Sequence, residues 1–356
     1  MERLYSILEI MKIKDIVRFH SETTMPIPDV VYHLYSLPSF DNNQTREELL
    51  GQDIQSNKFT VPNRCILFNK LNVRFKRIWR IDSDEDHKIA STEFLPLIID
   101  ENKVDFAYCF YLLASPAITD YLCGQNANTS GSHKRIDPTN FFNIGIKLPP
   151  LAQQYEIGKL LSSLDAKIKL NRQINQNLEA MAKQLYDYWF VQFDFPNEEG
   201  KPYKSSGGEM VWNEKLKRNI PVGWHCGNLF EIAVFTNGLA CQKFRPKDDE
   251  VPLPVIKIRE MHDGISVDTE EVTSNIPESV KVYNGDVLFS WSASLEVMLW
   301  AYGLGGLNQH IFKVASANDF PKSFYYFQLL DYVDVFKKMA EARKTTMGHI
   351  TQDHLQ

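Results

Sequence analysis

Residues 151–189, LAQQYEIGKLLSSLDAKIKLNRQINQNLEAMAKQLYDYW, carry the clearest structural signal in the chain. Apolar or amide residues recur at alternating steps of four and three, the heptad spacing of a coiled-coil helix, and no Gly or Pro follows Gly158. Pro149-Pro150 marks the start because proline is tolerated only in the first turn of a helix. At about 1.5 Å per residue the helix would span roughly 58 Å, which favours a spacer over an amphipathic helix packed on a domain core. The predicted seam residues are Ile157, Leu161, Leu164, Ile168, Asn171, Asn175, Leu178, Ala182, Leu185 and Trp189.

Two of these seam residues, Asn171 and Asn175, are polar and lie near the middle of the stretch. A buried amide at a seam position fixes helix register, because a misaligned partner leaves it unpaired. The alternative is that this part of the helix is simply exposed to solvent.

The segments on the two sides of the helix repeat one another, which predicts a duplicated module. The matches keep their order and nearly constant offsets, so chance is a poor explanation. They pair 13–19 with 229–235, 66–68 with 287–289, 106–113 with 323–330, and 129–133 with 345–349. Within each module, Cys65–Phe68 and Asp286–Phe289 have the pattern of buried strands, whereas Phe106–Tyr121 and Phe324–Met339 have helical spacing.

These patterns predict an α+β protein with two mixed α/β modules separated by one long helix. The expected boundaries are 1–150 for the first module, 151–192 for the helix, 193–224 for a Gly- and Pro-containing linker, and 225–356 for the second module. A chain of 356 residues has the length for two domains and a connector.

Composition narrows the class of protein. No stretch of eighteen apolar residues is present to span a membrane, and Met1–Tyr5 lacks the features of a signal peptide. The five cysteines are odd in number and never spaced as CxxC, which fits a reducing cytoplasm and argues against a structural zinc site. The net charge of −6 weighs modestly against a nucleic-acid partner, since phosphate binding relies on Lys and Arg.

Catalytic motifs are missing from the sequence. There is no Walker A loop, no GxGxxG that opens a helix, no HExxH and no GxSxG. Gly303–Gly306 lacks the lysine of a phosphate loop and is expected to be a turn, and Pro149-Pro150 lacks the flanking residues of an adenine methyltransferase loop. The nine histidines are not at metal-ligand spacing. We therefore expect no enzymatic activity, no metal and no cofactor in this chain.

Basic and donor-rich segments recur in both modules and are candidates to contact DNA, because Arg, Lys, Asn and hydroxyl side chains bind phosphates and base edges. Each could instead be a solvated surface loop, and the segment Trp291–Ser294 could be a packing corner. The candidates in the first module are Arg74, Lys76, Arg77, Asn128, Ser130, Ser132, His133, Lys134 and Arg135. Those in the second module are Lys243, Arg245, Lys257, Arg259, Arg343, Lys344, Thr345 and His349.

Residues 145–235 resemble the central region of type I restriction–modification specificity subunits. The segments that carry the resemblance are 148–154, 185–196 (LYDYWFVQFDFP), 200–208 (GKPYKSSGG), 210–214 and 220–224 (IPVGW). The flanking modules match only by position and by their Thr-x-x-x-His features, in the places of the variable target-recognition domains.

This resemblance implies a non-catalytic subunit that reads a bipartite site on double-stranded DNA, one half per module. It also implies that the helix sets the gap, docks two methyltransferase subunits that methylate adenine N6, and recruits a restriction subunit through the complex. Members of the family end with a second spacer helix, and from the sequence as far as Gln356 we expect no such helix here. We therefore also expect the unpaired seam to support a homodimer. Two other functions stay open: an interaction scaffold without DNA readout, and an enzyme with an unrecognised site.

Overall fold

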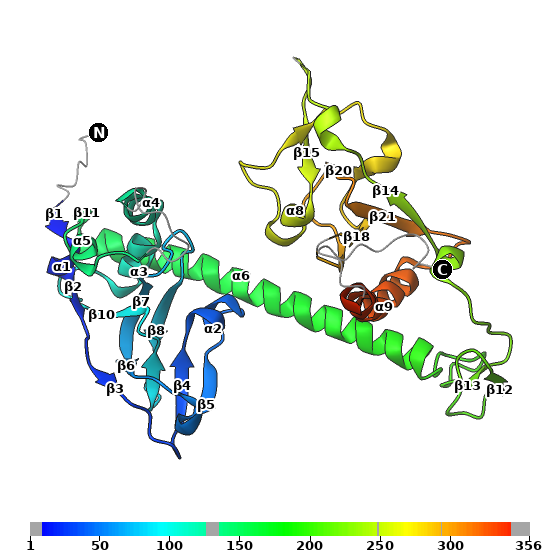
Figure 1. Cartoon of the computed structure of the whole chain (residues 1–356), viewed down its shortest axis with the longest axis horizontal. Coiled ribbons are helices and arrows are strands. Elements are labelled where there is room, and N and C mark those ends of the chain that lie inside the picture. Colours follow the sequence, from blue (N-terminus) through cyan, green and yellow to red (C-terminus); the bar gives the residue numbers. More distant parts are fainter. Residues whose placement is uncertain (1–8, 126–134, 248, 293, 343–356) are drawn as a thin grey trace. The chain divides into compact units, whose positions relative to one another are not determined.

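The computed structural model describes residues 9–125, 135–247, 249–292 and 294–342. The chain divides into two compact units, unit 1 (Met1–Ile174) and unit 2 (Asn175–Gln356), each with its own sheets and core (Figure 1). Both units mix helices and strands, which confirms the predicted α+β class.

Unit 1 is built on two main sheets. The first is antiparallel, with the strand order β2 (Val17–Phe19), β10 (Phe94–Ile99), β7 (Arg64–Asn69) and β8 (Ile78–Asp82). The second has the order β3 (Thr23–Thr24), β6 (Lys58–Thr60), β9 (Lys88–Ala90), β4 (Val31–Tyr35) and β5 (Glu47–Leu50). The helices are α1 (Ile13–Ile16), α2 (Leu37–Asp41), α3 (Phe106–Ala114), α4 (Pro116–Gln125) and α5 (Pro138–Phe142), and a small sheet pairs β1 (Glu9–Lys12) with β11 (Gly145–Leu148).

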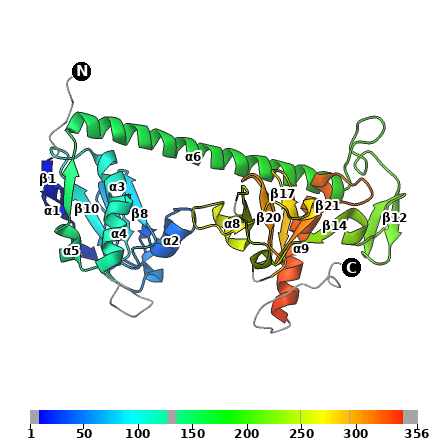
Figure 2. The same cartoon turned by 90° about the horizontal axis from the view of Figure 1, so that it is seen from above.

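Unit 2 repeats this plan. Its antiparallel sheet has the order β14 (Ala233–Asn237), β21 (Ile311–Ser316), β18 (Val287–Ser290) and β19 (Glu296–Leu299). Its second sheet has the order β16 (Glu271–Val272), β15 (Leu253–Ile256), β20 (Gly305–Leu307) and β17 (Lys281–Val282). The helices are α7 (Leu229–Ile232), α8 (Ile258–Asp263) and α9 (Lys322–Ala342), and the hairpin β12 (Met210–Asn213)–β13 (Arg218–Pro221) precedes them (Figure 2).

The strand orders make the duplication visible. In each unit a short helix leads into the edge strand of the antiparallel sheet, and the two predicted buried strands, β7 and β18, occupy the same place in that order. In each second sheet one parallel pair, β4–β9 or β15–β20, adjoins an antiparallel strand. The buried faces of β7 and β18 carry Ile66, Leu67, Phe68, Val287, Leu288 and Phe289, all 0–1% exposed.

The predicted long helix is α6 (Leu151–Tyr186), which ends in a wider turn over Asp187–Val191. In unit 1 its first turns pack on α3, where the Gln154 side chain accepts a bond from the Asp105 backbone N–H at 3.0 Å. In unit 2 its last turns pack on α9: Lys183 pairs with Asp331 at 2.9 Å, and the buried Tyr186 ring contacts Phe327. Every residue from 163 to 182 is exposed.

Two expectations about local structure need correction. The helical run Phe106–Tyr121 is two helices, because Ser115 is extended (φ −67°, ψ 151°), as expected for a residue that precedes a proline, here Pro116. The glycine run begins with a positive φ at Gly303 (+88°) and a bend at Leu304, but Gly305 and Gly306 belong to β20. A Cβ on Gly306 would lie 2.6 Å from Val272 Cγ1, so close packing in the sheet requires glycine there.

Candidate nucleic-acid interface

The β7–β8 loop of unit 1 carries the first predicted basic segment and is firmly braced. The Asn69 side chain accepts a bond from the Leu71 backbone N–H (2.8 Å) and donates one to the Leu71 carbonyl (2.6 Å). Val73 is buried (6% exposed) and anchors the middle of the loop. These contacts hold the following residues, 74–77, in a defined position on the surface.

At the tip of this loop, Arg74, Phe75 and Lys76 are exposed. The guanidinium carbons of Arg74 and Arg77 lie 4.7 and 4.9 Å from the centre of the Phe75 ring, within cation–π range. Arg77 differs from its neighbours, because its guanidinium makes two 2.7 Å bonds to the Asp41 carboxylate of α2. Arg77 therefore braces the loop, whereas Arg74 and Lys76 present their charges to solvent.

Arg135, the one described residue of the second predicted segment of unit 1, lies next to this loop. Arg135 forms an isolated β-bridge with Leu71, and the Ile136 backbone N–H donates to the Lys70 carbonyl at 2.9 Å. The Arg135 guanidinium makes bonds of 3.0 and 2.6 Å to Glu93, and it lowers the pKa of that carboxyl. The predicted residues Asn128, Ser130, Ser132, His133 and Lys134 lie outside the described residues, as does the repeat match at 129–133.

In unit 2 the predicted cations gather around carboxylates beside β15. Lys257 bonds to Glu270 at 2.6 Å, and Arg245 lies 3.8 Å from the same carboxylate. The hydrogen bond from Lys257 lowers the pKa of Glu270, so that carboxylate is ionised at neutral pH and offsets part of the positive charge. Arg259 pairs with the buried Glu260 at 2.7 Å and also donates to the Asp268 carbonyl at 3.0 Å.

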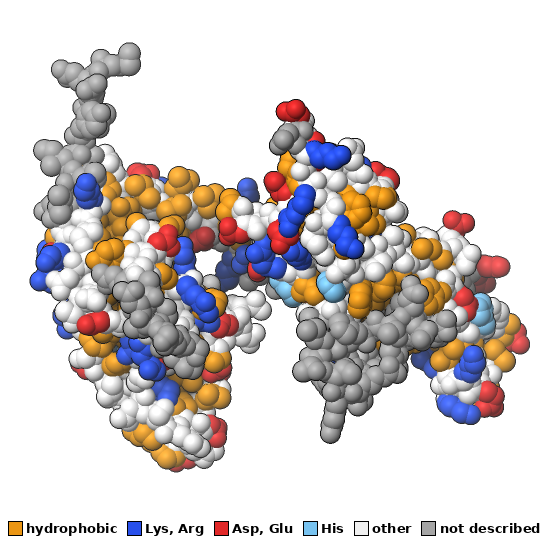
Figure 3. Space-filling model, turned by 45° about the horizontal axis from the view of Figure 1, so that its top comes forward, with side chains coloured by type: hydrophobic (Ala, Val, Ile, Leu, Met, Phe, Trp, Pro, Cys, Tyr) orange, Lys and Arg blue, Asp and Glu red, His pale blue; other side chains and the backbone are white. Residues whose placement is uncertain are grey.

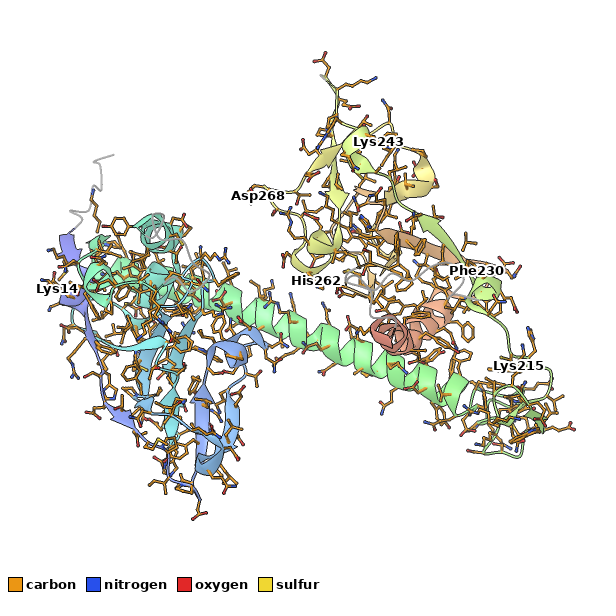
Figure 4. All side chains as sticks on the ribbon, in the orientation of Figure 1. Lys14, Lys215, Phe230, Lys243, His262 and Asp268 are labelled. Atoms are coloured by element: carbon orange, nitrogen blue, oxygen red, sulfur yellow. The ribbon has the colours of Figure 1, made fainter. Side chains whose placement is uncertain are left out.

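Lys243 is exposed and lies in the upper part of unit 2, and Asp268 lies at the left edge of that unit (Figure 4). Lys and Arg side chains lie on the surface of both units, interspersed with acidic ones (Figure 3). The predicted residues Arg343, Lys344, Thr345 and His349 lie outside the described residues, together with the repeat match at 345–349.

The carboxylates that pair with the predicted Lys and Arg residues were not predicted from the sequence. Asp41, Glu93 and Glu270 each come from a different element than the cation they hold, 36, 42 and 13 residues away. No local spacing signals such pairs. By contrast, Trp291 packs against His310 and Phe312 at ring distances of 5.7 and 5.9 Å, as expected for a packing corner.

The predicted seam of α6 is accessible in the single chain. Ile157, Leu164, Ile168, Leu178 and Leu185 are 40–57% exposed. Leu161 and Trp189 are half-buried, and both seam amides, Asn171 and Asn175, are exposed. Leu160, Ile174 and Met181 widen the apolar stripe and are 61%, 45% and 65% exposed.

Within the described part of the chain, no group of three His, Cys, Asp or Glu side chains is placed to hold a metal ion. The described helices include none that is long and apolar enough to cross a membrane. All five cysteines are free thiols.

Two mixed α/β units are joined through a long helix, their antiparallel sheets share one strand order, and cationic side chains are exposed on their surfaces. This arrangement is typical of a modular binding protein. Comparison with known proteins agrees. Residues 8–180 match the family model described as the type I restriction modification DNA specificity domain. The matched region, just under half of the chain, is similar to the specificity subunits of type I restriction–modification systems.

Individual relatives match over parts of their length. The HindI specificity subunit of Haemophilus influenzae is 33% identical over 129 residues, covering 36% of this chain and 28% of that protein. The MjaIX specificity subunit of Methanocaldococcus jannaschii is 22% identical over 190 residues, covering 52% of this chain and 41% of that protein. The chain therefore matches less than half the length of these curated relatives.

A solved structure shows the same fold over most of the chain. The crystal structure of a type I restriction–modification system S subunit from M. genitalium has a TM-score of 0.52 at 12% identity. The match covers 98% of this chain and 85% of that one.

Proposed function

We propose that this chain recognises a bipartite DNA target, with one half read by each unit, as the cytoplasmic specificity subunit of a type I complex. The observation that carries the proposal is the bridge between Leu71 and Arg135, which sets one predicted DNA-binding residue beside the loop that carries Arg74 and Lys76. Arg74 and Lys76 at the edge of that surface are exposed, as phosphate contacts must be.

In this proposal α6 docks the methyltransferase subunits, two in a full complex, and the restriction subunit joins through the complex. The exposed apolar stripe of α6 supports a docking role, because apolar stripes of this kind mark interaction sites. The adenine-N6 methylation would be carried out by the methyltransferase subunits, and this chain would supply only target choice.

The test is the salt dependence of duplex binding, measured by anisotropy on a DNA that carries the recognised site. Each phosphate contact contributes about 0.9 to the slope of log affinity against log salt. The double variant Arg74→Ala/Lys76→Ala should reduce the slope by up to about 2. The matched control is Lys215→Ala/Lys217→Ala on the β12–β13 hairpin, where the same loss of charge should leave the slope unchanged.

A scaffold that binds only proteins is the second candidate function, favoured by the exposed seam and by the net charge of −6. A scaffold predicts a flat salt slope for DNA, and Arg74→Ala/Lys76→Ala would then have no effect. The two functions are therefore separated by one titration.

A further inference from the structure

Phe75 is an exposed aromatic residue at the tip of the β7–β8 loop. Its side chain is 47% exposed, and the neighbouring cations Arg74 and Lys76 are exposed as well. The backbone of Phe75 is held within the loop, because its N–H donates to the Asn72 carbonyl at 3.0 Å and its carbonyl accepts from the Arg77 N–H at 2.8 Å. The ring therefore stands at the surface on a backbone that is fixed by hydrogen bonds.

The ring of Phe75 also has a fixed neighbour on its inner side chain environment, the guanidinium of Arg77. The guanidinium carbon lies 4.9 Å from the ring centre, and the Arg77 side chain is only 17% exposed. Two 2.7 Å bonds to Asp41 hold that guanidinium in place. Cation–π attraction favours one position of the ring beside it. The ring is thus preorganised, so a ligand bound through it pays little for ordering the side chain.

Single exposed apolar side chains are common on protein surfaces and indicate no site by themselves. Phe75 differs because exposed cations, Arg74 and Lys76, precede and follow it in the chain. A ligand that contacts the ring must therefore also accept positive charge on both sides. Duplex DNA has both features: phosphates that bind Lys and Arg, and stacked base pairs between which apolar side chains such as Phe insert.

We propose that Phe75 is a wedge that enters between two adjacent base pairs of the half-site read by unit 1, while Arg74 and Lys76 bind the phosphates beside the opened step. The inference rests on the proposed recognition of DNA and adds a means of choosing the target. Pyrimidine–purine steps such as TA and CA are the easiest to unstack. The wedge therefore selects a deformable step without a hydrogen bond to a base.

The test uses a duplex that carries the recognised site, with 2-aminopurine in place of each adenine of that half-site in turn, on either strand. The fluorescence of 2-aminopurine rises when the base loses a stacked neighbour. Binding of the full chain should raise the fluorescence several-fold at one step. Phe75→Ala should abolish the rise and weaken binding by about tenfold, the effect of losing one aromatic–base contact. Phe75→Leu should keep most of the rise, since Leu is also an apolar wedge.

The salt dependence of binding separates a wedge from a structural role in the loop. Phe75 carries no charge, so Phe75→Ala should leave the slope of log affinity against log salt unchanged. A loop that lost its shape would also lose phosphate contacts, and its slope would fall. The matched control is Tyr155→Ala in α6, which removes a ring that is 55% exposed and lies 5.9 Å from the Lys159 ammonium. It should change neither the fluorescence nor the affinity.

The outcomes distinguish the wedge from the proposed function on which it rests. Salt-dependent binding without a rise in fluorescence at any position, or equal rises for the parent and Phe75→Ala, would overturn the wedge and leave DNA recognition standing. A lower salt slope for Phe75→Ala would show that the ring supports the loop, and would also overturn the wedge. A flat slope for the parent would overturn the proposed DNA recognition, and the wedge with it.

Discussion

Gly158 allows α6 to pack closely against the start of α3. It faces the start of α3, where a Cβ would lie 2.7 Å from Asp105 Oδ1 and 2.8 Å from the Tyr108 nitrogen. That carboxylate caps α3 by accepting the Tyr108 N–H at 2.8 Å. Only glycine lets α6 approach this cap without displacing it.

Gly158→Ala should therefore destabilise unit 1, by about 1–3 kcal/mol as for other overpacked contacts. The control is Gly124→Ala in α4, where a Cβ meets nothing within 4 Å and the substitution should stabilise by up to about 1 kcal/mol. Urea unfolding of both variants measures the two effects. Equal stability of Gly158→Ala and the parent would contradict the close approach.

The cysteines differ in burial and therefore in reactivity. Burial raises the pKa of the Cys65 thiol to about 12 and raises that of Cys109 further, whereas Cys123 and Cys226 are partly exposed. Because the thiolate is the reactive form, a thiol reagent at pH 8 should label Cys123 and Cys226 well before Cys65 and Cys109. Mass spectrometry of the labelled peptides gives the order, and early labelling of Cys65 in the native chain would refute it.

The same raised pKa values have a consequence for stability. Neutral buried thiols stabilise the fold fully below the ordinary thiol pKa near 9, and this contribution is lost as pH rises from there toward the pKa of the folded state. The stability of unit 1 should thus fall between about pH 9 and 12. Cys65→Ala/Cys109→Ala is the control, since it should show a smaller alkaline loss even though it is less stable at pH 7.

At the level of elements, α6 has one apolar stripe with nothing covering it between residues 163 and 182 of the described chain. Side chains such as Leu164 and Leu178 (49% and 57% exposed) each gain about 1.5–3 kcal/mol on full burial. An antiparallel pair of α6 helices from two copies would bury them with two-fold symmetry. Sedimentation at micromolar concentration should show a dimer.

Leu164→Glu should weaken that dimer because it places a charge in the seam, whereas Gln173→Glu, on the opposite face of the helix, should not. A monomer at all concentrations, or equal effects of the two substitutions, would rule out pairing through this seam. A methyltransferase subunit added to the dimer should compete with it if both use the same stripe.

Elements with strong periodicity could be predicted from the sequence. The heptads of α6 and the apolar triplets of β7 and β18 are local patterns. They can be recognised without knowing which elements pack against them in the fold. The division of Phe106–Tyr121 was also readable, since Pro116 disfavours helix at Ser115. The place of Gly305 and Gly306 in β20 was not, because it depends on Ile256 and Val272 from other strands.

The candidate site was likewise predictable only where the signal is local in the sequence. The basic run at 74–77 was predicted, and the structure adds that Arg77 is held by Asp41 while Arg74 and Lys76 are exposed. Which cation is structural depends on a carboxylate 36 residues away, and such long-range pairing leaves no periodic trace in a single sequence.

For the whole molecule, the net charge of −6 is less informative than its distribution. Several predicted cations are neutralised by carboxylates in place, such as Arg135 by Glu93 and Lys257 by Glu270. If the chain binds DNA as proposed, few uncompensated cations are left to contact phosphates, so its salt slope should be shallow compared with that of a basic DNA-binding protein.

The final prediction concerns the length of α6. We assume that the helix sets the gap between two half-sites of the DNA. Seven extra residues inserted at one point within 166–177, where all side chains are exposed, would lengthen α6 by about 10 Å. At about 3.4 Å per base pair this adds roughly three base pairs to the gap. A heptad rotates the helix by only about 20°, so the half-sites should stay the same.

An insertion of two residues serves as the control, since it turns the following part of the helix by roughly half a revolution and should abolish recognition of any single gap. The readout is the sequence methylated by the assembled complex. A changed half-site after heptad insertion would mean that α6 contributes to base readout, and an unchanged gap would mean that it does not act as the spacer.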